Sequence, residues 1–166
     1  MEHVRPVVAC LPRAASGVNA LLTADAADRS AWYRAVAAVG EEVEAARVQA
    51  MASLSLVRPT RRARAVRLSQ SVSLLVGIMV AAARVAAEGV QAPIAPSAMA
   101  RSDEMVRMCD EAMLLVLPTQ RSRPRAEEMA WEQGRLHQLD TLVTEVSAVL
   151  DDLMVDLVRM AATEVG

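Results

Sequence analysis

The sequence predicts an all-α protein, an antiparallel up-and-down bundle of about five helices. Of its 166 residues, 54% are hydrophobic but only 2% are aromatic, and Phe is absent. Ala, Val, Leu and Met must therefore build the core, which suits close helix packing better than a sheet. Between the prolines, apolar residues recur every three or four positions, the period of a helix. The length suits a single helical domain spanning residues 1–166.

The first two helices are expected at about residues 14–23 and 31–57. Asp25, Asp28 and Ser30 lie between them and are residue types that cap helix N-termini. The second helix carries apolar residues at steps of three and four, and acidic residues can take its outer face. Its predicted buried positions are Trp32, Val36, Val39, Val43, Ala46, Ala50 and Leu54.

The third helix is expected at about residues 61–89 and is the most apolar stretch. Pro59 and Thr60 are interpreted as a stop followed by an N-cap, and Gly89 as a C-cap. About 16 uncharged residues lie between Arg67 and Arg84. A membrane-spanning helix needs roughly 20 predominantly apolar residues. The stretch is therefore predicted to be buried inside the bundle, with no transmembrane span.

A fourth helix, from residue 99 or 102 to 117, and a last one, at about 124–163, follow two linkers. The last helix has the clearest pattern, because its apolar residues keep heptad a and d spacing without a slip. The predicted seam is Leu136, Leu139, Val143, Val146, Leu150, Leu153, Leu157 and Met160. A wider stripe of Leu142, Val149, Met154 and Val158 predicts contact with at least two neighbouring helices.

The order of a short helix, a loop and a long heptad-patterned helix occurs twice, roughly 95 to 100 residues apart. This order divides the chain into two candidate repeats, 14–90 and 98–164. The second candidate repeat lacks a third helix, because the sequence stops at Gly166.

All 18 positive charges are arginines, and the net charge is −2. The charge gives no overall attraction to nucleic acid, and no aromatic residues interleave with the arginines. The absence of Lys removes Schiff-base and phosphate-loop lysine chemistry. One cluster crowds the start of the third helix, at Arg58, Arg61, Arg62, Arg64 and Arg67. A second precedes the last helix, at Arg121, Arg123 and Arg125.

Cations at a helix N-terminus oppose the helix macrodipole. Internal carboxylates, a bound anion or a protein partner could offset that cost for the cluster at Arg58–Arg67. The sequence leaves these three alternatives open, and the cluster is a candidate contact for a partner or an anion.

No catalytic, cofactor or metal residue is predicted. Glu41, Glu42, Glu44, Asp151 and Asp152 could supply oxygen ligands, but no Glu-x-x-His pair occurs, and a solvated face is expected. The sequence also contains no nucleophile-elbow motif, no glycine-rich phosphate-binding loop and no CxxC motif.

The histidines and cysteines have structural interpretations. His137 falls beside the heptad seam at an exposed position, and His3 lies near the N-terminus. Cys10 and Cys109 do not form a disulfide framework, which indicates reduced thiols and a cytoplasmic protein. Cys109 is expected in the core.

Small residues lie at four-residue intervals on one face of the third helix, at Ser69, Ser73, Gly77 and Ala81. Such a face allows another helix to approach closely. Glycine in mid-helix costs about 0.5–1 kcal/mol relative to alanine, so Gly77 is expected to have a packing role. Ser73, Gly77 and Ala81 are the predicted close-packing residues.

The order of these features resembles the PhoU family of phosphate-uptake regulators, which are built from two similar three-helix bundles. The stretch EEVEAARVQAMASLSLVRPTRRARAVRLSQSVSLLVGIMVAAARVAAEG is similar to the family's first repeat. Pro59 and Arg62 match its turn, and Ala87 and Glu88 match the end of its third helix. QLDTL resembles an acidic segment of the second repeat.

The chain departs from the family at its metal motif, whose carboxylate positions fall on Gly77 and Ala81. Ala63 replaces the Asp that follows the matched Arg62. The resemblance therefore implies a PhoU-like scaffold of five helices that lacks the family's metal site.

The preferred interpretation is a non-enzymatic regulatory or adaptor protein. The resemblance implies a role in phosphate transport or signalling, because PhoU proteins are thought to couple a phosphate ABC transporter to a sensor kinase. Five helices leave one apolar stripe short of a neighbour, which predicts a homodimer or a protein partner. Two alternatives remain, a metal- or ligand-binding bundle and a structural or assembly subunit.

Overall fold

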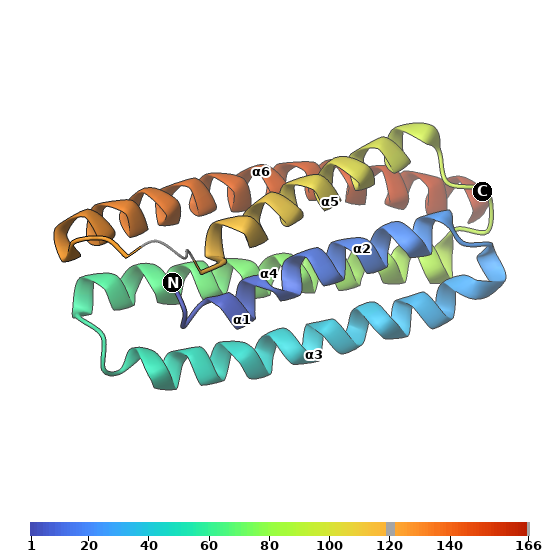
Figure 1. Ribbon diagram of the computed structural model, residues 1–166. Helices are drawn as coiled ribbons and strands as arrows, with labels where there is room; N and C mark the ends of the chain where they lie inside the picture. Colours follow the sequence, from blue (N-terminus) through green and yellow to red (C-terminus); the bar gives the residue numbers. More distant parts are fainter. Residues whose placement is uncertain (119–121, 166) are drawn as a thin grey trace.

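The computed structural model describes residues 1–118 and 122–165 and consists of five long helices (Figure 1). A four-residue helix, α1 (Arg5–Val8), precedes them, and a short 3₁₀ turn, η1 (Ala26–Asp28), follows the first. The long helices are α2 (Cys10–Thr23), α3 (Arg29–Leu54), α4 (Pro59–Gly89), α5 (Pro96–Val116) and α6 (Arg125–Val165). No strand occurs among the described residues, so the predicted all-α helical bundle is confirmed.

The helices run alternately up and down, so that α2, α4 and α6 are parallel to one another and antiparallel to α3 and α5 (Figure 1). Helix α3 packs against α2 and α4, and α5 packs against α2 and α6. Helix α4 also contacts both α2 and α6. The N-terminus, the α3–α4 turn, the end of α5 and the start of α6 lie toward the left end of Figure 1. Helices α2 and α4 thus each have three long neighbours.

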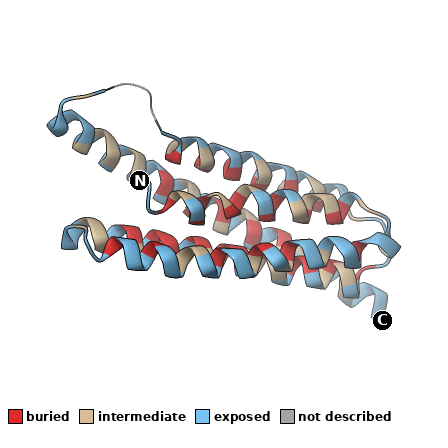
Figure 2. Cartoon of the chain, turned by 60° about the horizontal axis from the view of Figure 1, so that its bottom comes forward, coloured by how far each residue is buried: buried red, intermediate tan, exposed pale blue. Residues whose placement is uncertain are grey.

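The core is aliphatic, as the composition predicts, and the buried residues face inward on every helix (Figure 2). Small side chains allow the helix axes to approach closely, and Ala82, Ala83 and Ala86 of α4 are completely buried. Six of the eight predicted seam residues of α6 are buried; Leu136 and Met160 are only partly covered. The heptad prediction is therefore confirmed over the middle of the helix.

Two predicted core positions are wrong. Val158 is 50% exposed and Trp32 is 42% exposed. Val158 lies at the edge of a stripe that is wider than the surface its neighbours α4 and α5 cover. Trp32 lies in the first turn of α3, before Val36, which is the first buried apolar residue of that helix.

The N-terminal segment belongs to the bundle, although the sequence predicts a first helix only from about residue 14. Pro6 and Pro12 lie in the first turns of α1 and α2. Proline is tolerated there because the amide groups of a first turn have no helical acceptor. Val7, Val8 and Leu11 are fully buried, so this segment contributes to the core.

The predicted side-chain caps are also wrong. Asp28 precedes α3 but makes no capping hydrogen bond, and Ser30 lies inside the helix. Pro59 is the first residue of α4, which places Thr60 within that helix. Gly89 is the last residue of α4 and does not adopt a positive φ.

Charged side chains from other helices hold the connection between α4 and α5. The guanidinium of Arg29, which is 2% exposed, donates to the carbonyl oxygens of Val90 at 2.5 Å and Ala92 at 3.2 Å. From α6, the Glu164 carboxylate accepts from the backbone N–H groups of Gln91 and Ala92 at 2.7 and 2.8 Å. These two backbone donors lower the pKa of Glu164, because they stabilise its charged form.

Arginines likewise satisfy carbonyl groups at the end of α5. Arg5 donates through Nε to Val116 O at 3.0 Å, and Arg135 donates through Nη1 to Leu115 O at 2.9 Å. The last four carbonyl groups of a helix have no partner within the helix, and cations are favourable at that end of the dipole. The arginines thus tie the N-terminus and α6 to the end of α5.

At Gly89, α4 lies close to α6. A Cβ atom built on Gly89 would lie 2.9 Å from Cβ of Ala161. Because the obstructing atom is itself a Cβ, it can move only with the α6 backbone. Gly77, in contrast, has nothing within 4 Å of its Cβ position.

We therefore expect opposite effects from alanine at these two glycines. Gly89→Ala should lower the free energy of unfolding by about 1–3 kcal/mol through overpacking. Gly77→Ala should raise it by about 0.5–1 kcal/mol through helix propensity. Urea unfolding of dilute protein measures both. Adding Ala161→Gly to Gly89→Ala should recover part of the loss, and a destabilising Gly77→Ala would contradict the assignment of Gly77 to open surface.

Candidate functional site

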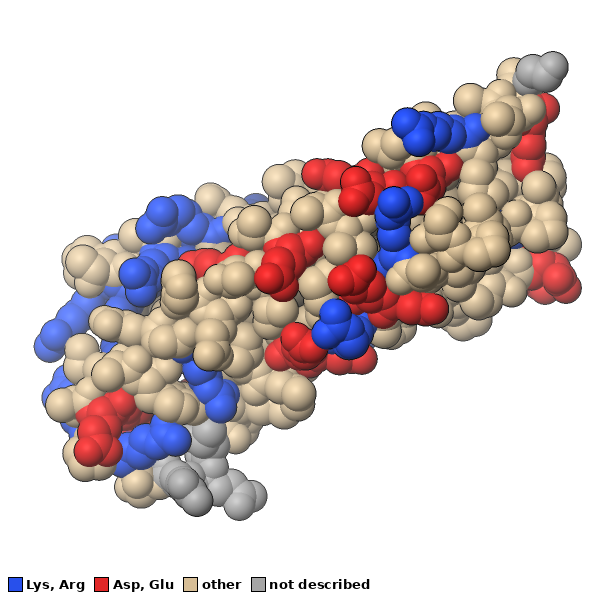
Figure 3. Space-filling model, turned by 90° about the horizontal axis from the view of Figure 1, so that it is seen from above, with Lys and Arg blue, Asp and Glu red and all other residues tan. Residues whose placement is uncertain are grey.

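The arginine cluster at the start of α4 lies at the end of the bundle that also holds the N-terminus and the start of α6. Figure 3 shows blue side chains gathered at this end, whereas acidic side chains dominate the middle of the same face. Arg58, Arg64 and Arg67 are exposed. Arg61 and Arg62 are partly buried, and both have partners within the chain.

Arg62 closes the end of α3. Its guanidinium donates through Nε to Leu54 O at 3.0 Å, and through Nη2 to Ser55 O at 3.0 Å and Val57 O at 2.8 Å. Its charge is unfavourable at the N-terminus of α4 but favourable at the C-terminus of α3, which lies beside it. Backbone carbonyl oxygens therefore offset the unfavourable interaction of Arg62 with the α4 dipole. They are not among the three alternatives that the sequence suggests for this cluster.

Arg61 is paired with a carboxylate. Its Nη2 lies 2.8 Å from Oε2 of Glu132 on α6, and the N-terminal amino group of Met1 lies 2.7 Å from Oε1 of the same side chain. The Glu132 side chain is 21% exposed. One glutamate thus joins the chain terminus, α4 and α6, and this part of the cluster meets an internal carboxylate.

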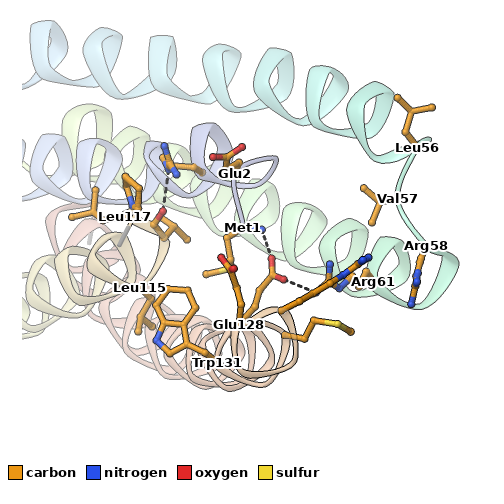
Figure 4. Close-up of a pocket in the computed structure, with 16 residues that line it drawn as sticks. Met1, Glu2, Leu56, Val57, Arg58, Arg61, Leu115, Leu117, Glu128 and Trp131 are labelled. Carbon is orange, nitrogen blue, oxygen red and sulfur yellow. Dashed lines mark hydrogen bonds and ion pairs between the residues drawn. The ribbon is translucent and has the colours of Figure 1, made fainter. Parts of the chain in front are cut away.

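A cavity of about 590 Å³ opens beside this ion pair (Figure 4). Trp131, Met1 and Leu117 provide apolar parts of its lining. Its charged lining residues are Arg5, Arg58, Arg61, Arg125, Glu2, Glu128 and Glu132. Both signs of charge line the cavity, and Arg5 and Arg61 already have partners within the chain. The positive charge of the cavity is therefore largely balanced by other groups of the same chain.

Arg123, a member of the second arginine cluster, stacks on Trp131 together with Arg135 of α6. The guanidinium carbon of Arg123 lies 4.5 Å from the ring centre, and that of Arg135 lies 3.9 Å from it, both in cation–π geometry. Burial lowers the pKa of Arg135, and the nearby Arg123 adds to the effect. Arg125 is exposed, and Arg121 lies outside the described residues.

The carboxylates considered as metal ligands serve other contacts or face solvent. Glu42 pairs with Arg13, which lowers the pKa of Glu42. Glu44 accepts from Ser73 and pairs with Arg47, and both contacts lower its pKa. Glu41, Asp151 and Asp152 are exposed. In the described part of the chain, no three His, Cys, Asp or Glu side chains gather in an arrangement that could hold a metal ion.

The histidines are exposed and the cysteines are buried. His137 lies in a shallow groove between α5 and α6, beside Leu114 and Leu142. His3 is exposed near the N-terminus. Cys10 and Cys109 are buried free thiols. Burial raises the pKa of Cys10, and it raises the pKa of Cys109 to about 12, so both thiols are protonated at neutral pH.

The outer face of α4, formed by Leu74, Gly77, Ile78 and Ala81, is the main apolar surface on a helix that otherwise builds the core. Leu74 is 67% exposed, and Gly77 and Ala81 are also exposed. Together with Gln70, Ser73, Glu44 and Arg47, these residues line a shallow groove of about 440 Å³ along α3 and α4. The spacing of small residues in the sequence does not reveal Leu74 as part of this surface.

Only the Gly77 and Ala81 half of the small-residue stripe is exposed, and it does not pack against another helix of the described chain. Ser73 donates to Glu44 on α3, but nothing lies within 4 Å of the Cβ position of Gly77. Ser69, the first member of the stripe, is buried, and its hydroxyl has no hydrogen-bond partner among the described residues. Close packing at Gly77 and Ala81 stays a prediction, now for a helix outside this copy of the chain.

A heptad-like spacing follows the outer face of α4. Steps of four and three residues connect Gln70, Leu74, Gly77, Ala81, Arg84 and Glu88. Helix α4 is also long and apolar enough to cross a membrane by length and composition, and 39% of its most apolar window is buried in the bundle. Part of the apolar surface of α4 therefore remains outside the core of the bundle.

No family model, curated protein or solved structure matches this chain.

Removing the Arg62 guanidinium should destabilise the helical hairpin of α3 and α4. Because three carbonyl groups lose a charged donor, we expect Arg62→Ala to lower the free energy of unfolding by about 1–3 kcal/mol. The matched control is Arg64→Ala, which removes the same charge from an exposed site and should change it by less than about 0.5 kcal/mol. Urea unfolding followed by circular dichroism distinguishes the two. Equal losses would show that the net charge, not the carbonyl contacts, matters.

Proposed function

We propose that this chain is a non-enzymatic regulatory or adaptor protein that acts by binding a protein partner, either another protein or a second copy of itself, through the outer face of α4. One observation carries the proposal: α4, which is long and apolar enough to cross a membrane by length and composition, buries one side in the core and leaves Leu74 67% exposed on the other. Contiguous exposed apolar residues rimmed by polar ones are typical of interaction sites. Here the rim consists of Gln70, Glu44 and Arg47.

The shape of the outer face suits a helix as the bound element. Gly77 and Ala81 form a shallow depression, and Leu74 and Ile78 stand beside it. A partner helix could insert its side chains over the small residues and cover the large ones. This is the helix-in-groove mode of recognition, in which anchors recur every three or four residues.

We propose regulation of phosphate transport or signalling as the pathway, at the cytoplasmic side of a membrane transporter. The resemblance to PhoU proteins supports this narrower proposal. Its matched turn, Pro59 and Arg62, joins α3 to α4 through the guanidinium–carbonyl contacts described above. The positions at which the family carries metal-binding carboxylates are Gly77 and Ala81, which lie on the apolar outer face here. Protein binding would thus take the place of metal binding on this surface.

A charge on the outer face should abolish partner binding without unfolding the bundle. Tagged wild-type chain, expressed in its native host, should retain a specific protein that Leu74→Glu loses, because a carboxylate in the contact would be desolvated. The matched control is Leu114→Glu, since Leu114 on α5 is 63% exposed. Mass spectrometry identifies the retained protein, and circular dichroism checks the fold.

Retention of the same proteins by wild type and Leu74→Glu would remove the support for the outer face as the binding site. A transporter or kinase subunit of phosphate uptake among the proteins lost would support the pathway. An unrelated partner would leave the adaptor role and reject the pathway.

A further inference from the structure

We propose that a second copy of this chain occupies the outer face of α4, through an antiparallel pair of α4 helices related by a twofold axis. This inference rests on the proposed function, because it names the partner of the same surface. It follows from the order of side chains along the face, which is complementary to itself when the second helix runs in the opposite direction. The two ends and the centre of the face each contribute to that complementarity.

The centre of the face fixes the register by size. A twofold axis that passes between Gly77 and Ile78 places Leu74 of one copy opposite Ala81 of the other, and Gly77 opposite Ile78. Each large side chain then meets a small one, and the symmetry repeats every contact. The Cβ position of Gly77 is open and Leu74 is 67% exposed in the single chain, so both are available for this contact.

The same register pairs opposite charges at the ends of the face. It places Arg67 of one copy opposite Glu88 of the other. Arg67 is exposed and forms no ion pair with any described residue. Glu88 pairs with Arg84 at 3.2 Å through one oxygen and is 62% exposed, so its other oxygen can accept from Arg67.

A parallel pair is disfavoured by these charges. In that arrangement Arg67 of one copy would lie beside Arg67 of the other, and Glu88 beside Glu88. The Arg67 and Glu88 positions are about 32 Å apart along the helix, so neither like-charge contact could be relieved by the other. Like charges directly opposite one another are unfavourable in helix pairs, as coiled coils show at their flanking positions. The charge order therefore selects the antiparallel orientation and favours a second copy over a partner that lacks this arrangement.

The association should be concentration-dependent. A single pair of helices covers less than the roughly 1,600 Å² of a standard stable interface, so monomer and dimer should coexist at micromolar concentrations. The two Arg67–Glu88 pairs lie at the solvent-exposed ends of the contact. Salt should therefore weaken the dimer, since exposed ion pairs are screened.

Charge reversal tests the register. Sedimentation velocity over a concentration series should show a wild-type dimer that is weakened roughly tenfold by Arg67→Glu or by Glu88→Arg, because each creates two like-charge contacts. The double variant Arg67→Glu/Glu88→Arg exchanges the charges and should return to within about threefold of wild type. Arg64→Glu, on the same helix, is the control and should leave the dimer intact.

Cross-linking tests the position of the axis. Gly77→Cys places a thiol beside the axis in each copy, and a short bis-maleimide should join the two chains. Leu114→Cys is the control: it should still form the non-covalent dimer but give no cross-linked product. The native thiols do not interfere, because Cys10 and Cys109 are buried and protonated.

Several outcomes would overturn the inference. A monomer at every concentration would do so, as would a dimer whose strength no charge reversal changes, since it would use another surface. Binding to lipid vesicles that Leu74→Glu abolishes, with no dimer, would assign the face to a membrane. The proposed adaptor role would still stand if the chain is monomeric but Leu74→Glu loses a specific host protein. It would fall separately if that variant retains every partner.

Discussion

The structure depends on close packing of aliphatic helix faces without the help of large aromatic side chains. Val, Leu, Ala and Met fill the core, and the helices approach closely where these residues are smallest, as at Gly89 against Ala161. In such a bundle each helix can bury only the sides that its neighbours cover. Helix α4 has three neighbours and still has apolar residues on its fourth side, and this excess is the basis of the functional proposal.

The helix ends depend on arginines rather than on capping residues of the same helix. A guanidinium carries several donors in a fixed plane and can reach two or three carbonyl groups at once, as Arg62 and Arg29 do. Because the bundle alternates up and down, the start of one helix lies beside the end of the preceding one. A cation at the N-terminus of α4 can therefore serve the C-terminus of α3. This geometry accounts for Arg62, one of the five cations at the start of α4.

The sequence predicts the helices better than their ends and their neighbours. Apolar periodicity finds all five long helices and the buried seam of α6, because these features depend on residue spacing alone. It misses α1 and the first turn of α2, where proline suggests a break but occupies a tolerated position. It also misses the acceptors of Arg62, since every residue carries a carbonyl and only the fold shows which ones lack a partner. The spacing at Gly77 and Ala81 correctly marks a helix face, but periodicity cannot tell whether that face meets the core or solvent.

The same limit applies to the question of a membrane. By length and composition α4 could cross a bilayer, yet its inner side contributes Val72, Val76 and Met79 to the core, each fully buried. To span a membrane, α4 would have to leave α2, α3 and α6, which would expose their apolar faces as well. A partner that covers only the outer side leaves these contacts in place and still removes Leu74 and Ile78 from water. Covering that side with another apolar helix therefore removes the exposed apolar residues of α4 from water without disrupting the contacts of α4 with the rest of the bundle.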